Sequence, residues 1–539
     1  MKSVKALMVH PPFNAGSFWN YKETCDLAGA KYPASPLGLI TVAAMLPSHW
    51  DIRLIDQNTV ELSDEQIEWA DLVMAGGMLP QQFGALELIE RCRSLGKTIA
   101  VGGPDATTTP HLYERADFRI LGEAEDVLGQ FVADFEDGAT SGYYQAPKFQ
   151  VDVTKTPVPR FDLLNFKNYL NVNIQFSRGC PFLCEFCDII ELYGRKPRTK
   201  DTGQVLGELQ ALYDLGYRGH VDLVDDNLIG NKKAVKAFLP HLISWQKARN
   251  YPFEFSTEAS LNLADDAELL QMLRAANFFT IFIGIESPDP DVLAMARKKQ
   301  NTRREISDSI QCIYDAGITV IAGFIVGFDN ESPHTATGMI DLIEDCSIPV
   351  CMVGLLYAMP NTQLSRRLEK EGRLYPENEV ADGPGGHGDQ CTSGINFDTL
   401  RPRQNILADY RAVVAHTYAP KNYFARVTRV GRLLNMSGPM GSINWRMLAH
   451  DAKQFIRLLW GITIHRPDMR VGFWKAITIC LVTNPRATKS VIKMLALYAH
   501  LGRFSGYVID QIDLQIKAVE TGQWQPNTMY ENADFEAAE

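Results

Sequence analysis

The chain has 539 residues, of which 46% are hydrophobic and 22% are charged, and its net charge at pH 7 is −11. A chain of this length and balance is expected to form roughly two to four globular domains, which excludes a disordered or fibrous protein. The negative net charge argues against general nucleic-acid binding, so we expect no nucleic-acid partner. No apolar stretch approaches the roughly 18 residues that cross a bilayer.

The start of the chain and its cysteines predict a cytoplasmic protein. The first residues, MKSVKALMVHPPF, hold a short apolar run that prolines follow at once, which is typical of a β-strand and not of a signal peptide. The ten cysteines are too few for a disulfide scaffold, and three of them lie within eight positions. This pattern predicts a reducing compartment and a metal site.

Residues 1–140 predict a doubly wound, Rossmann-like α/β domain, because short apolar runs alternate with helical patterns. The expected strands are 5–9, 51–55, 72–75, 98–101 and 118–121. Glycines follow three successive strands, where a sheet of this kind binds its ligand and where glycine lets the backbone approach closely. The candidate cofactor-binding glycines are Gly76, Gly102, Gly103 and Gly122. Ordinary turn glycines are the alternative.

A linker rich in proline is expected over residues 141–172, and a second βα series follows over residues 173–375. Six apolar runs and five helical patterns predict a partial (β/α)6 barrel, whose active site would lie at the carboxyl ends of the strands. The expected strands are 173–176, 220–224, 253–257, 280–284, 319–325 and 351–356. Residues 376–392 predict a flexible lid or linker, and residues 393–539 a helical, basic domain.

The segment SRGCPFLCEFC places Cys180, Cys184 and Cys187 in a C-x3-C-x2-C spacing just after the first barrel strand. Thiolates so spaced can hold three irons of a [4Fe–4S] cluster and leave the fourth iron open. On spacing alone, a zinc site is the alternative. A basic segment, residues 193–198, follows the cysteines and is expected either to meet a cofactor or to be solvated.

The cysteine motif and its place after the first barrel strand resemble the radical S-adenosylmethionine (SAM) superfamily, over residues 173–356. The resemblance implies that the open iron chelates the amino and carboxylate groups of SAM. It also implies that one electron, from a donor such as flavodoxin or ferredoxin, cleaves SAM to a 5′-deoxyadenosyl radical.

Further barrel residues fit the same family. Carboxylates that end barrel strands can pair with the ammonium of SAM or accept from its ribose hydroxyls, and these are Asp225, Asp226, Glu258 and Glu286. The alternative for Asp226 is the N-cap of the next helix. Gly323 and Gly327 resemble the glycine motif that backs the adenine, although a bulge would also explain them.

Residues 1–140 resemble the cobalamin-binding domain that precedes the barrel in one large subfamily. That domain carries Asp-x-His-x-x-Gly after the second strand, and this chain has Asp56 and then Asn58 at the position of the histidine. Asp56 and Asn58 are therefore candidate cofactor-binding residues, and a cobalamin held here would lack a lower histidine ligand.

Residues beyond about 390 resemble the C-terminal domain of the hopanoid C-2 methylase branch. The resemblance predicts cobalamin-dependent methylation of an unactivated carbon on a small, hydrophobic, lipid-like substrate. Non-methylating oxidation or rearrangement is the alternative reaction, and a cobalamin or redox sensor is the alternative outside catalysis. Measurement of 5′-deoxyadenosine release separates the enzyme from the sensor.

Charge is unevenly distributed along the chain. Residues 401–520 carry 18 Lys and Arg against 6 Asp and Glu, a net charge of +12, which leaves −23 for the rest. Tryptophan, phenylalanine and leucine are interleaved with these basic residues between 445 and 509. The pattern predicts peripheral, salt-sensitive contact with the inner face of the membrane. The alternative is that the apolar residues cover the barrel and the basic face is solvated.

Overall fold

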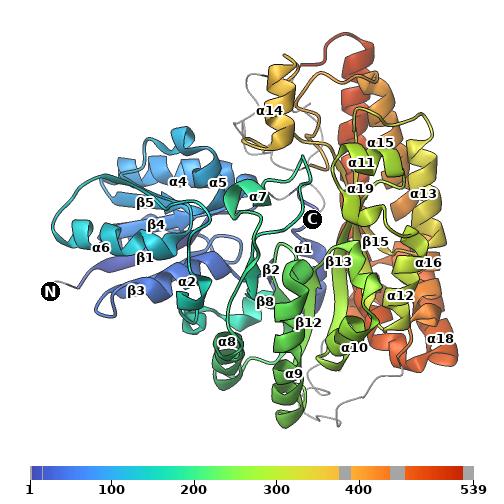
Figure 1. Ribbon diagram of the computed structural model, residues 1–539, viewed down its shortest axis with the longest axis horizontal. Helices are drawn as coiled ribbons and strands as arrows, with labels where there is room; N and C mark the ends of the chain where they lie inside the picture. Colours follow the sequence, from blue (N-terminus) through green and yellow to red (C-terminus); the bar gives the residue numbers. More distant parts are fainter. Residues whose placement is uncertain (1–2, 15, 376–389, 437–455, 526–539) are drawn as a thin grey trace.

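A computed structural model describes residues 3–14, 16–375, 390–436 and 456–525. Two parallel β-sheets lie side by side, and a group of long helices covers the second one (Figure 1). The predicted fold class, a doubly wound α/β domain, a partial barrel and a helical C-terminal region, is confirmed. The predicted lid, residues 376–392, lies almost wholly outside the described residues.

The first sheet has six parallel strands in the order β3-β1-β4-β5-β6-β7. Alternate side chains of β1 enter different clusters, with Leu7 and Val9 on one face and Ala6 and Met8 on the other. Both faces are therefore buried under helices, α3, α4 and α5 on one side and α2 and α6 on the other. The strands are β1 (Lys5–His10), β3 (Asp51–Asp56), β4 (Leu72–Gly76), β5 (Thr98–Gly102), β6 (Phe118–Leu121) and β7 (Gly142–Gln145). The helices are α2 (Leu37–Met45), α3 (Asp64–Trp69), α4 (Gln82–Ser94), α5 (Gly103–Thr108) and α6 (Leu128–Glu136).

The second sheet has seven parallel strands in the order β15-β14-β13-β12-β11-β8-β2 and forms the partial barrel. Its strands are β2 (Tyr32–Ala34), β8 (Tyr169–Ile174), β11 (Gly219–Leu223), β12 (Phe253–Glu258), β13 (Phe278–Glu286), β14 (Thr319–Val326) and β15 (Val350–Leu355). The helices that cover it are α8 (Thr202–Asp214), α9 (Lys232–Ala248), α10 (Ala267–Ala275), α11 (Pro290–Met295), α12 (Ile306–Asp315) and α13 (Thr335–Asp345).

Strand pairing crosses the predicted domain boundaries at two places. Strand β7 lies within the predicted linker 141–172 but pairs with β6 in the first sheet, and β8 begins in the same linker at Tyr169. Strand β2 lies within predicted domain 1–140 but pairs with β8 in the barrel sheet. Three residues are too few for a recognisable periodic pattern, so only pairing reveals β2. The other boundaries stay a prediction.

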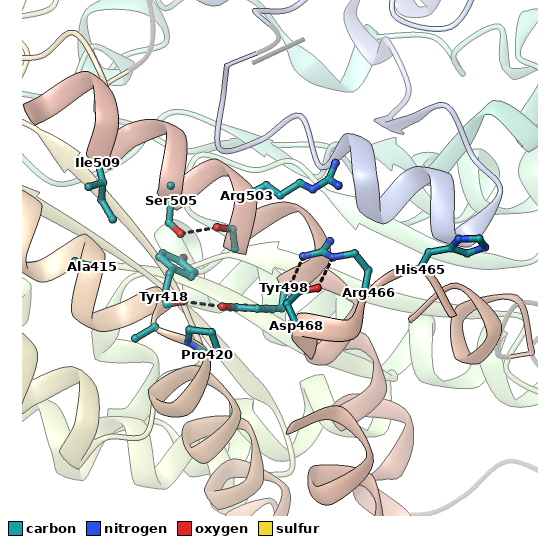
Figure 2. Close-up of a pocket in the computed structure, with 13 residues that line it drawn as sticks. Ala415, Tyr418, Pro420, His465, Arg466, Asp468, Tyr498, Arg503, Ser505 and Ile509 are labelled. Carbon is teal, nitrogen blue, oxygen red and sulfur yellow. Dashed lines mark hydrogen bonds and ion pairs between the residues drawn. The ribbon is translucent and has the colours of Figure 1, made fainter. Parts of the chain in front are cut away.

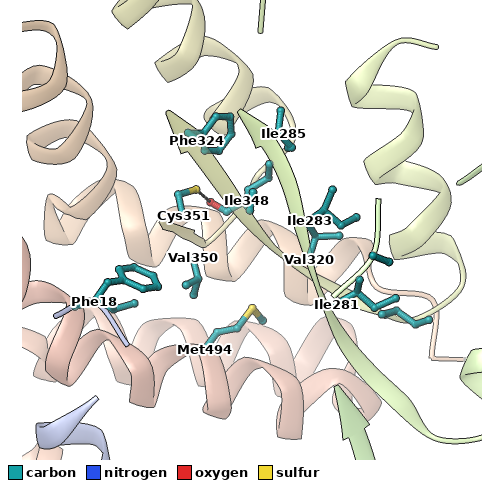
Figure 3. Packing of buried hydrophobic residues seen from close by; sticks show 14 of the residues in the cluster. Phe18, Ile281, Ile283, Ile285, Val320, Phe324, Ile348, Val350, Cys351 and Met494 are labelled. Atoms are coloured by element: carbon teal, nitrogen blue, oxygen red, sulfur yellow. Dashed lines mark hydrogen bonds between the residues drawn. The ribbon is translucent and has the colours of Figure 1, made fainter. Parts of the chain in front are cut away.

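The open side of the partial barrel is closed by segments from both ends of the chain. Phe18, just before helix α1 (Lys22–Ala28), has its ring centroid 6.3 Å from that of Phe504 in helix α19 (Thr488–Glu520). Trp19 reaches Phe282 of β13 at 5.5 Å between ring centroids. Figure 3 shows Phe18 near Val350 of β15 and Met494 of α19, in one continuous hydrophobic core.

Three further C-terminal helices pack beside α19. They are α15 (Arg403–Tyr418), α16 (Pro420–Leu433) and α18 (Pro467–Thr483). Helix α14 (Gln363–Lys370) follows the barrel and lies apart from them (Figure 1). Phe473 and Ile462 are buried among them, whereas the exposed side of α18 faces solvent. No helix in the described part of the chain is both long and apolar enough to cross a membrane.

Candidate active site

The three cysteines lie in a loop of residues 177–199, here named the cysteine loop, at the carboxyl end of β8. Strands β9 (Ser177–Arg178) and β10 (Arg198–Thr199) pair antiparallel and close its base, and helix α7 (Ile189–Leu192) forms its far side. Gly179 has φ +93°, and a Cβ there would lie 2.8 Å from the carbonyl oxygen of Gly194. Only glycine fits this turn, which leads directly into Cys180.

Asp225 and Asp226 hold the start of this loop. Asp225 accepts from the backbone N–H of Phe176 at 3.1 Å and from Ser177, whose hydroxyl donates at 2.6 Å. Asp226 accepts from the N–H of Gly179 at 2.7 Å. Burial raises the pKa of Asp225 to about 6, and burial together with the charges of Asp225 and Asp188 raises that of Asp226 to about 7. Both carboxylates therefore position the loop, and direct binding of SAM by them stays a prediction.

The thiols have neighbours that the sequence analysis missed. The side-chain amide of Asn227 lies 3.8 Å from Cys180 Sγ, and that of Gln300 lies 3.7 Å from Cys184 Sγ. Amide N–H groups beside sulfur are one means by which a protein tunes a cluster. Asn227 was detectable as the residue after two strand-end acids, but Gln300 belongs to a loop without any motif.

The donor set suits a cluster better than a single ion. The three cysteines are free thiols, and burial raises the pKa of each. Within the residues that the structure describes, no three His, Cys, Asp or Glu side chains could hold one metal ion. Cluster thiolates bind different irons, so their sulfurs lie farther apart than the ligands of one zinc ion. The C-x3-C-x2-C order of the three thiols suits such a cluster.

Glu286 forms a buried ion pair with Lys298 beside the thiols. Glu286 has φ +67°, at a bulge where β13 shifts its register against β14. A side chain at Gly284 would collide with both partners, so that glycine makes room for the pair. Burial alone would lower the pKa of Lys298, but Glu286 and the nearby Cys184 thiolate raise it. The site therefore keeps a positive charge beside the cysteines, and Lys298 was not predicted.

Glu258 ends β12 in register with Phe282 of β13, and its side chain is exposed at this end of the strand. The surrounding protein desolvates it, and this effect, with the charges of Asp222, Asp226 and Asp225, raises its pKa to about 8. The Glu258 carboxyl group is therefore mostly protonated at neutral pH and can donate a hydrogen bond.

A second polar group that the sequence did not reveal lies within β11 and β12, before the residues that end these strands. His220 Nε2 lies 2.5 Å from Ser256 Oγ, and Ser256 donates to Asp222. Burial and the charge of Lys493 lower the pKa of His220 to about 3. The interior wall formed by these two strands is thus polar, and the histidine in it is neutral.

The predicted glycines Gly323, in β14, and Gly327, just after it, have different surroundings. A Cβ at Gly323 would lie 2.9 Å from the Phe282 ring, so this glycine admits an aromatic side chain from the next strand. Gly327 has φ +117°, and its N–H donates to Glu331 at 2.9 Å. The fold alone therefore explains why glycine occupies both positions. Contact of these glycines with adenine stays a prediction.

The predicted glycines of the first sheet meet at one edge and pack backbone against backbone. A Cβ at Gly102 would lie 2.6 Å from the carbonyl oxygen of Ile120, and one at Gly76 would lie 3.3 Å from that of Gly102. Gly103 and Gly122 have φ +90° and +80°. The sheet itself therefore requires these glycines, and any ligand contact would be additional.

Asp56 and Asn58 join the loops after β1 and β3. Asn58 donates to Asp56 at 2.8 Å and accepts from the N–H of Phe13 at 2.7 Å, and Tyr169 donates to Asp56 at 2.9 Å. Burial would raise the pKa of Asp56, but hydrogen bonds from His10 and Asn58 and the charge of His10 hold it below its usual range. Asn58 thus has a structural role at the position where the related motif has histidine.

Buried ion pairs tie the first sheet to the cysteine loop. Arg178 contacts Glu123 at 3.1 Å and Glu125 at 2.7 Å, and Arg198 contacts the other oxygen of Glu123 at 2.8 Å. Glu123 follows β6, and Arg178 is two residues before Cys180. The edge that carries the predicted cobalamin-site glycines is therefore held beside the cysteine loop. Arg198 of the predicted basic segment meets protein carboxylate, whereas Arg195 and Lys196 are exposed.

Helix α14 holds the cysteine loop from the other side. Arg367 Nη2 lies 3.0 Å from Glu185, which is next to Cys184, and Arg367 Nη1 lies 2.9 Å from Asp329. The N–H of Leu364 also donates to the Glu185 carbonyl at 2.8 Å. The loop is thus fastened by the first sheet, the barrel and the helix that follows the barrel.

A separate surface pocket of about 510 Å³ lies in the helical region, away from the cysteines. Figure 2 shows Tyr498 bonded to the carbonyl oxygen of Tyr418, at 2.8 Å, and Arg466 paired with Asp468 at 2.9 Å. The groups on its wall mostly satisfy one another, so the pocket is not the catalytic centre.

Comparison with known proteins agrees with this geometry. The radical SAM superfamily model matches residues 174–343, and the model of a domain of unknown function, DUF4070, matches residues 362–513. An uncharacterized methyltransferase of Synechocystis sp. is 39% identical over 97% of this chain and 96% of its own length. The hopanoid C-2 methylase of Rhodopseudomonas palustris is 34% identical over 88% of each chain.

Two solved structures share the fold. The radical SAM methyltransferase TsrM from Kitasatospora setae superposes with a TM-score of 0.59 at 16% identity, over 76% of this chain and 89% of that one. The cobalamin-dependent radical SAM enzyme OxsB superposes with a TM-score of 0.58 at 14% identity, over 97% and 82%. With the curated relatives and the cysteine loop at the barrel mouth, these matches mean that the chain is an enzyme of the radical SAM superfamily and belongs to the family that includes the hopanoid C-2 methylase.

Proposed function

We propose that this protein is a cobalamin-dependent radical SAM methyltransferase that methylates an unactivated carbon of a small, hydrophobic, lipid-like substrate. The observation that carries the proposal is the set of ion pairs from Arg178 and Arg198 to Glu123 and Glu125. Because of these pairs, the glycine edge of the first sheet and the cysteine loop face one another. When bound, the cluster and SAM would supply a 5′-deoxyadenosyl radical, and cobalamin would supply a methyl group.

The chain's own residues divide into ligands and positioning groups. Cys180, Cys184 and Cys187 would hold the cluster, whose loop Asp225 and Asp226 position through backbone N–H groups. The role of these residues as cofactor ligands is an inference from their placement at the barrel mouth. The same holds for Glu286, which its pair with Lys298 fixes beside the thiols and whose carboxylate would accept from the ammonium of SAM.

The barrel interior suits a largely apolar substrate with a polar group. Phe282 and Trp19 provide an aromatic wall, with ring centroids 5.5 Å apart, and Gly323 leaves space beside Phe282. On the neighbouring strand β12, Glu258 lies in register with Phe282, and its protonated carboxyl group would donate a hydrogen bond to an oxygen of the substrate. The similarity to the hopanoid C-2 methylase supports a lipid-like substrate of this kind.

Cobalamin would lie at the glycine edge without a histidine ligand from below. Asn58 replaces the histidine, and the nearby His10 is engaged on both ring nitrogens, by Asp56 at 3.2 Å and by Gln81 at 2.9 Å. We expect protein purified with cobalamin to show a corrinoid absorption and EPR spectrum without histidine coordination. A spectrum with a nitrogen ligand that His10→Ala removes would contradict this assignment.

The reductant and the cellular location complete the proposal. An acidic one-electron donor, a flavodoxin or a ferredoxin, would approach the exposed Arg195 and Lys196 at the rim of the cysteine loop. We also propose that the enzyme meets its hydrophobic substrate at the inner face of the membrane, as a peripheral protein.

The test is anaerobic incubation of the reconstituted enzyme with SAM, reductant, methylcobalamin and a panel of lipids, read by mass spectrometry. Formation of 5′-deoxyadenosine together with a lipid 14 mass units heavier, about one added CH₂, supports the proposal. Formation of 5′-deoxyadenosine with an oxidised or rearranged product would replace methylation by the alternative reaction. No 5′-deoxyadenosine with any substrate would overturn the catalytic role.

A further inference from the structure

Exposed apolar side chains concentrate in one short stretch of the C-terminal region. In the part of the chain that the structure describes, 16 large hydrophobic residues are exposed, and seven of them lie between residues 456 and 482. They are Ile456, Trp460, Ile464, Val471, Trp474, Leu481 and Val482. A soluble protein rarely leaves so many large apolar groups together without a partner for them.

These residues occupy one continuous face. In α18, Val471, Trp474, Leu481 and Val482 follow the spacing of one helix side, and Phe473 is buried on the other side. Ile456, Trp460 and Ile464 are four residues apart, so they likewise lie on one side of their segment. The indole N–H of Trp474 donates to Thr463 Oγ1 at 3.2 Å, which joins the two segments. We call this surface, residues 456–482, the docking face.

Basic charge accompanies this face, but several basic residues of 401–520 are paired elsewhere. Arg426 and Arg429 pair with Glu344 of the barrel, and Lys489 and Lys493 pair with Glu254. The predicted basic surface is therefore only partly solvated, because several of its charges neutralise barrel carboxylates.

Two of the charges that remain lie on the docking face itself. Arg470 and Lys475 are exposed on α18, and no ion pair to either is seen among the described residues. Between residues 456 and 486 the sequence has five Arg and Lys and a single acid, Asp468, which pairs with Arg466. Apolar side chains surrounded by unpaired cations complement an anionic lipid surface, where the cations meet headgroups and the aromatic rings enter the interface.

We propose that the docking face binds the surface of an anionic lipid bilayer. The inference rests on the membrane contact proposed above and names the surface that makes it. In Figure 1, α18 lies at the opposite end of the barrel from α7 and α14. Lys489 and Lys493, just after α18, meet Glu254 near the start of β12, whereas the cysteine loop follows the end of β8. Docking thus leaves the barrel mouth uncovered and open to the electron donor.

Vesicle co-sedimentation with the full-length protein tests the docking face. Vesicles of phosphatidylcholine alone are compared with vesicles that contain phosphatidylglycerol, at low and high salt. We expect binding to anionic vesicles that high salt weakens. Val471→Glu with Val482→Glu should reduce binding at least tenfold, because acidic groups replace the two most exposed apolar side chains. The matched control is Leu400→Glu, at a residue that is 69% exposed but outside the face, and it should bind as wild type.

Two double variants that each remove two positive charges separate electrostatic attraction from apolar insertion. Arg470→Gln with Lys475→Gln should weaken binding to anionic vesicles by about fivefold per lost charge, without any effect on neutral vesicles. Lys247→Gln with Lys370→Gln is the control for net charge. Circular dichroism and melting temperature verify that each variant is folded.

Two outcomes would overturn the proposal. One is equal binding of wild type and of the Val471→Glu and Val482→Glu variant, and the other is no binding to any vesicle at low salt, which would indicate a protein partner for the face. Release of 5′-deoxyadenosine, measured without vesicles, should be unchanged in this variant. Failure of docking is therefore distinguishable from failure of the catalytic proposal.

Discussion

At the residue scale, side chains predicted as cofactor ligands are also bound to the protein itself. Asp225 and Asp226 accept from the backbone before Cys180, and Glu286 pairs with Lys298. Their positions at strand ends were predictable because apolar runs stop there. Their partners were not, because a sequence does not tell which loop folds back over which strand.

The three loop cysteines should be required together. Changing Cys180, Cys184 or Cys187 to Ala should reduce iron in the anaerobically reconstituted enzyme from about four atoms per chain to near none and abolish 5′-deoxyadenosine formation. Iron analysis and chromatography measure both. Cys312→Ser is the control, since this thiol is half-buried and outside the loop, and it should keep both properties. An equal loss with Cys351→Ala or Cys391→Ala would require a different ligand set.

Glu258 predicts a specific pH dependence of stability. Its pKa is about 8 in the folded chain and about 4.3 in an unfolded one, so the folded state binds more protons between these values. Its contribution to stability is therefore full below about pH 4 and is lost as pH rises towards 8. Glu258→Gln lacks this loss, so the melting temperature of the variant relative to wild type should rise between pH 5.5 and pH 8.5. A difference that stays constant would mean that Glu258 is already ionised.

At the element scale, contacts with three elements fix the position of the cysteine loop. The first sheet contributes Glu123, β11 is followed by Asp225 and Asp226, and α14 contributes Arg367. From Glu123 to Arg367, these elements span more than 240 residues of the sequence. The order of strands and helices could be read from hydrophobic periodicity, but the ion pairs between them depend on tertiary packing.

The glycine edge of the first sheet should tolerate no side chain at Gly102. Gly102→Ala would place Cβ 2.6 Å from the Ile120 carbonyl oxygen on the paired strand, so we expect a loss of about 1–3 kcal/mol in the free energy of unfolding. Denaturant titration measures the change. In Gly129→Ala no heavy atom lies within 4 Å of the new Cβ, and stability should stay the same or rise slightly, because alanine favours a helix. Equal effects of the two changes would contradict the close approach at Gly102.

At the scale of the whole molecule, the N-terminal segment belongs to two units. Strand β1 enters the first sheet, and the chain then crosses to the barrel, where Phe18, α1 and β2 fill the open side before α2 returns to the first sheet. A fragment that begins after residue 140 would lose this filling, which the boundaries predicted from sequence do not reveal.

Phe18 provides the test of this arrangement. The side chain is 1% exposed and packs against Phe504, so Phe18→Ala should cost about 3–5 kcal/mol. Hydrogen exchange should accelerate in α19 and β15 and stay unchanged in β4 and β5, although Phe18 is eight residues from the end of β1. Leu400→Ala, at an exposed site, should change neither. Faster exchange confined to the first sheet would show that the segment belongs to that sheet alone.

The sequence by itself determined the two βα series, the cysteine motif and the polar ends of the strands. These features are local: apolar periodicity over a few residues predicts a strand or helix, and three cysteines within eight positions need no distant partner to be recognised. The strand ends predicted from sequence agree with the observed ends to within a few residues. Strand β2 has only three residues, too few for a periodic pattern, and was not predicted.

Only the tertiary structure decided which of these features meet. It paired β2 with β8, brought Glu123 to Arg178, placed Lys298 beside the thiols and divided the basic C-terminal residues between barrel carboxylates and the docking face. Each of these contacts joins residues far apart in the chain or in a loop without a motif. Their free energy comes from the burial of matched charges and apolar surface, which depends on the packing of whole elements and not on local pattern.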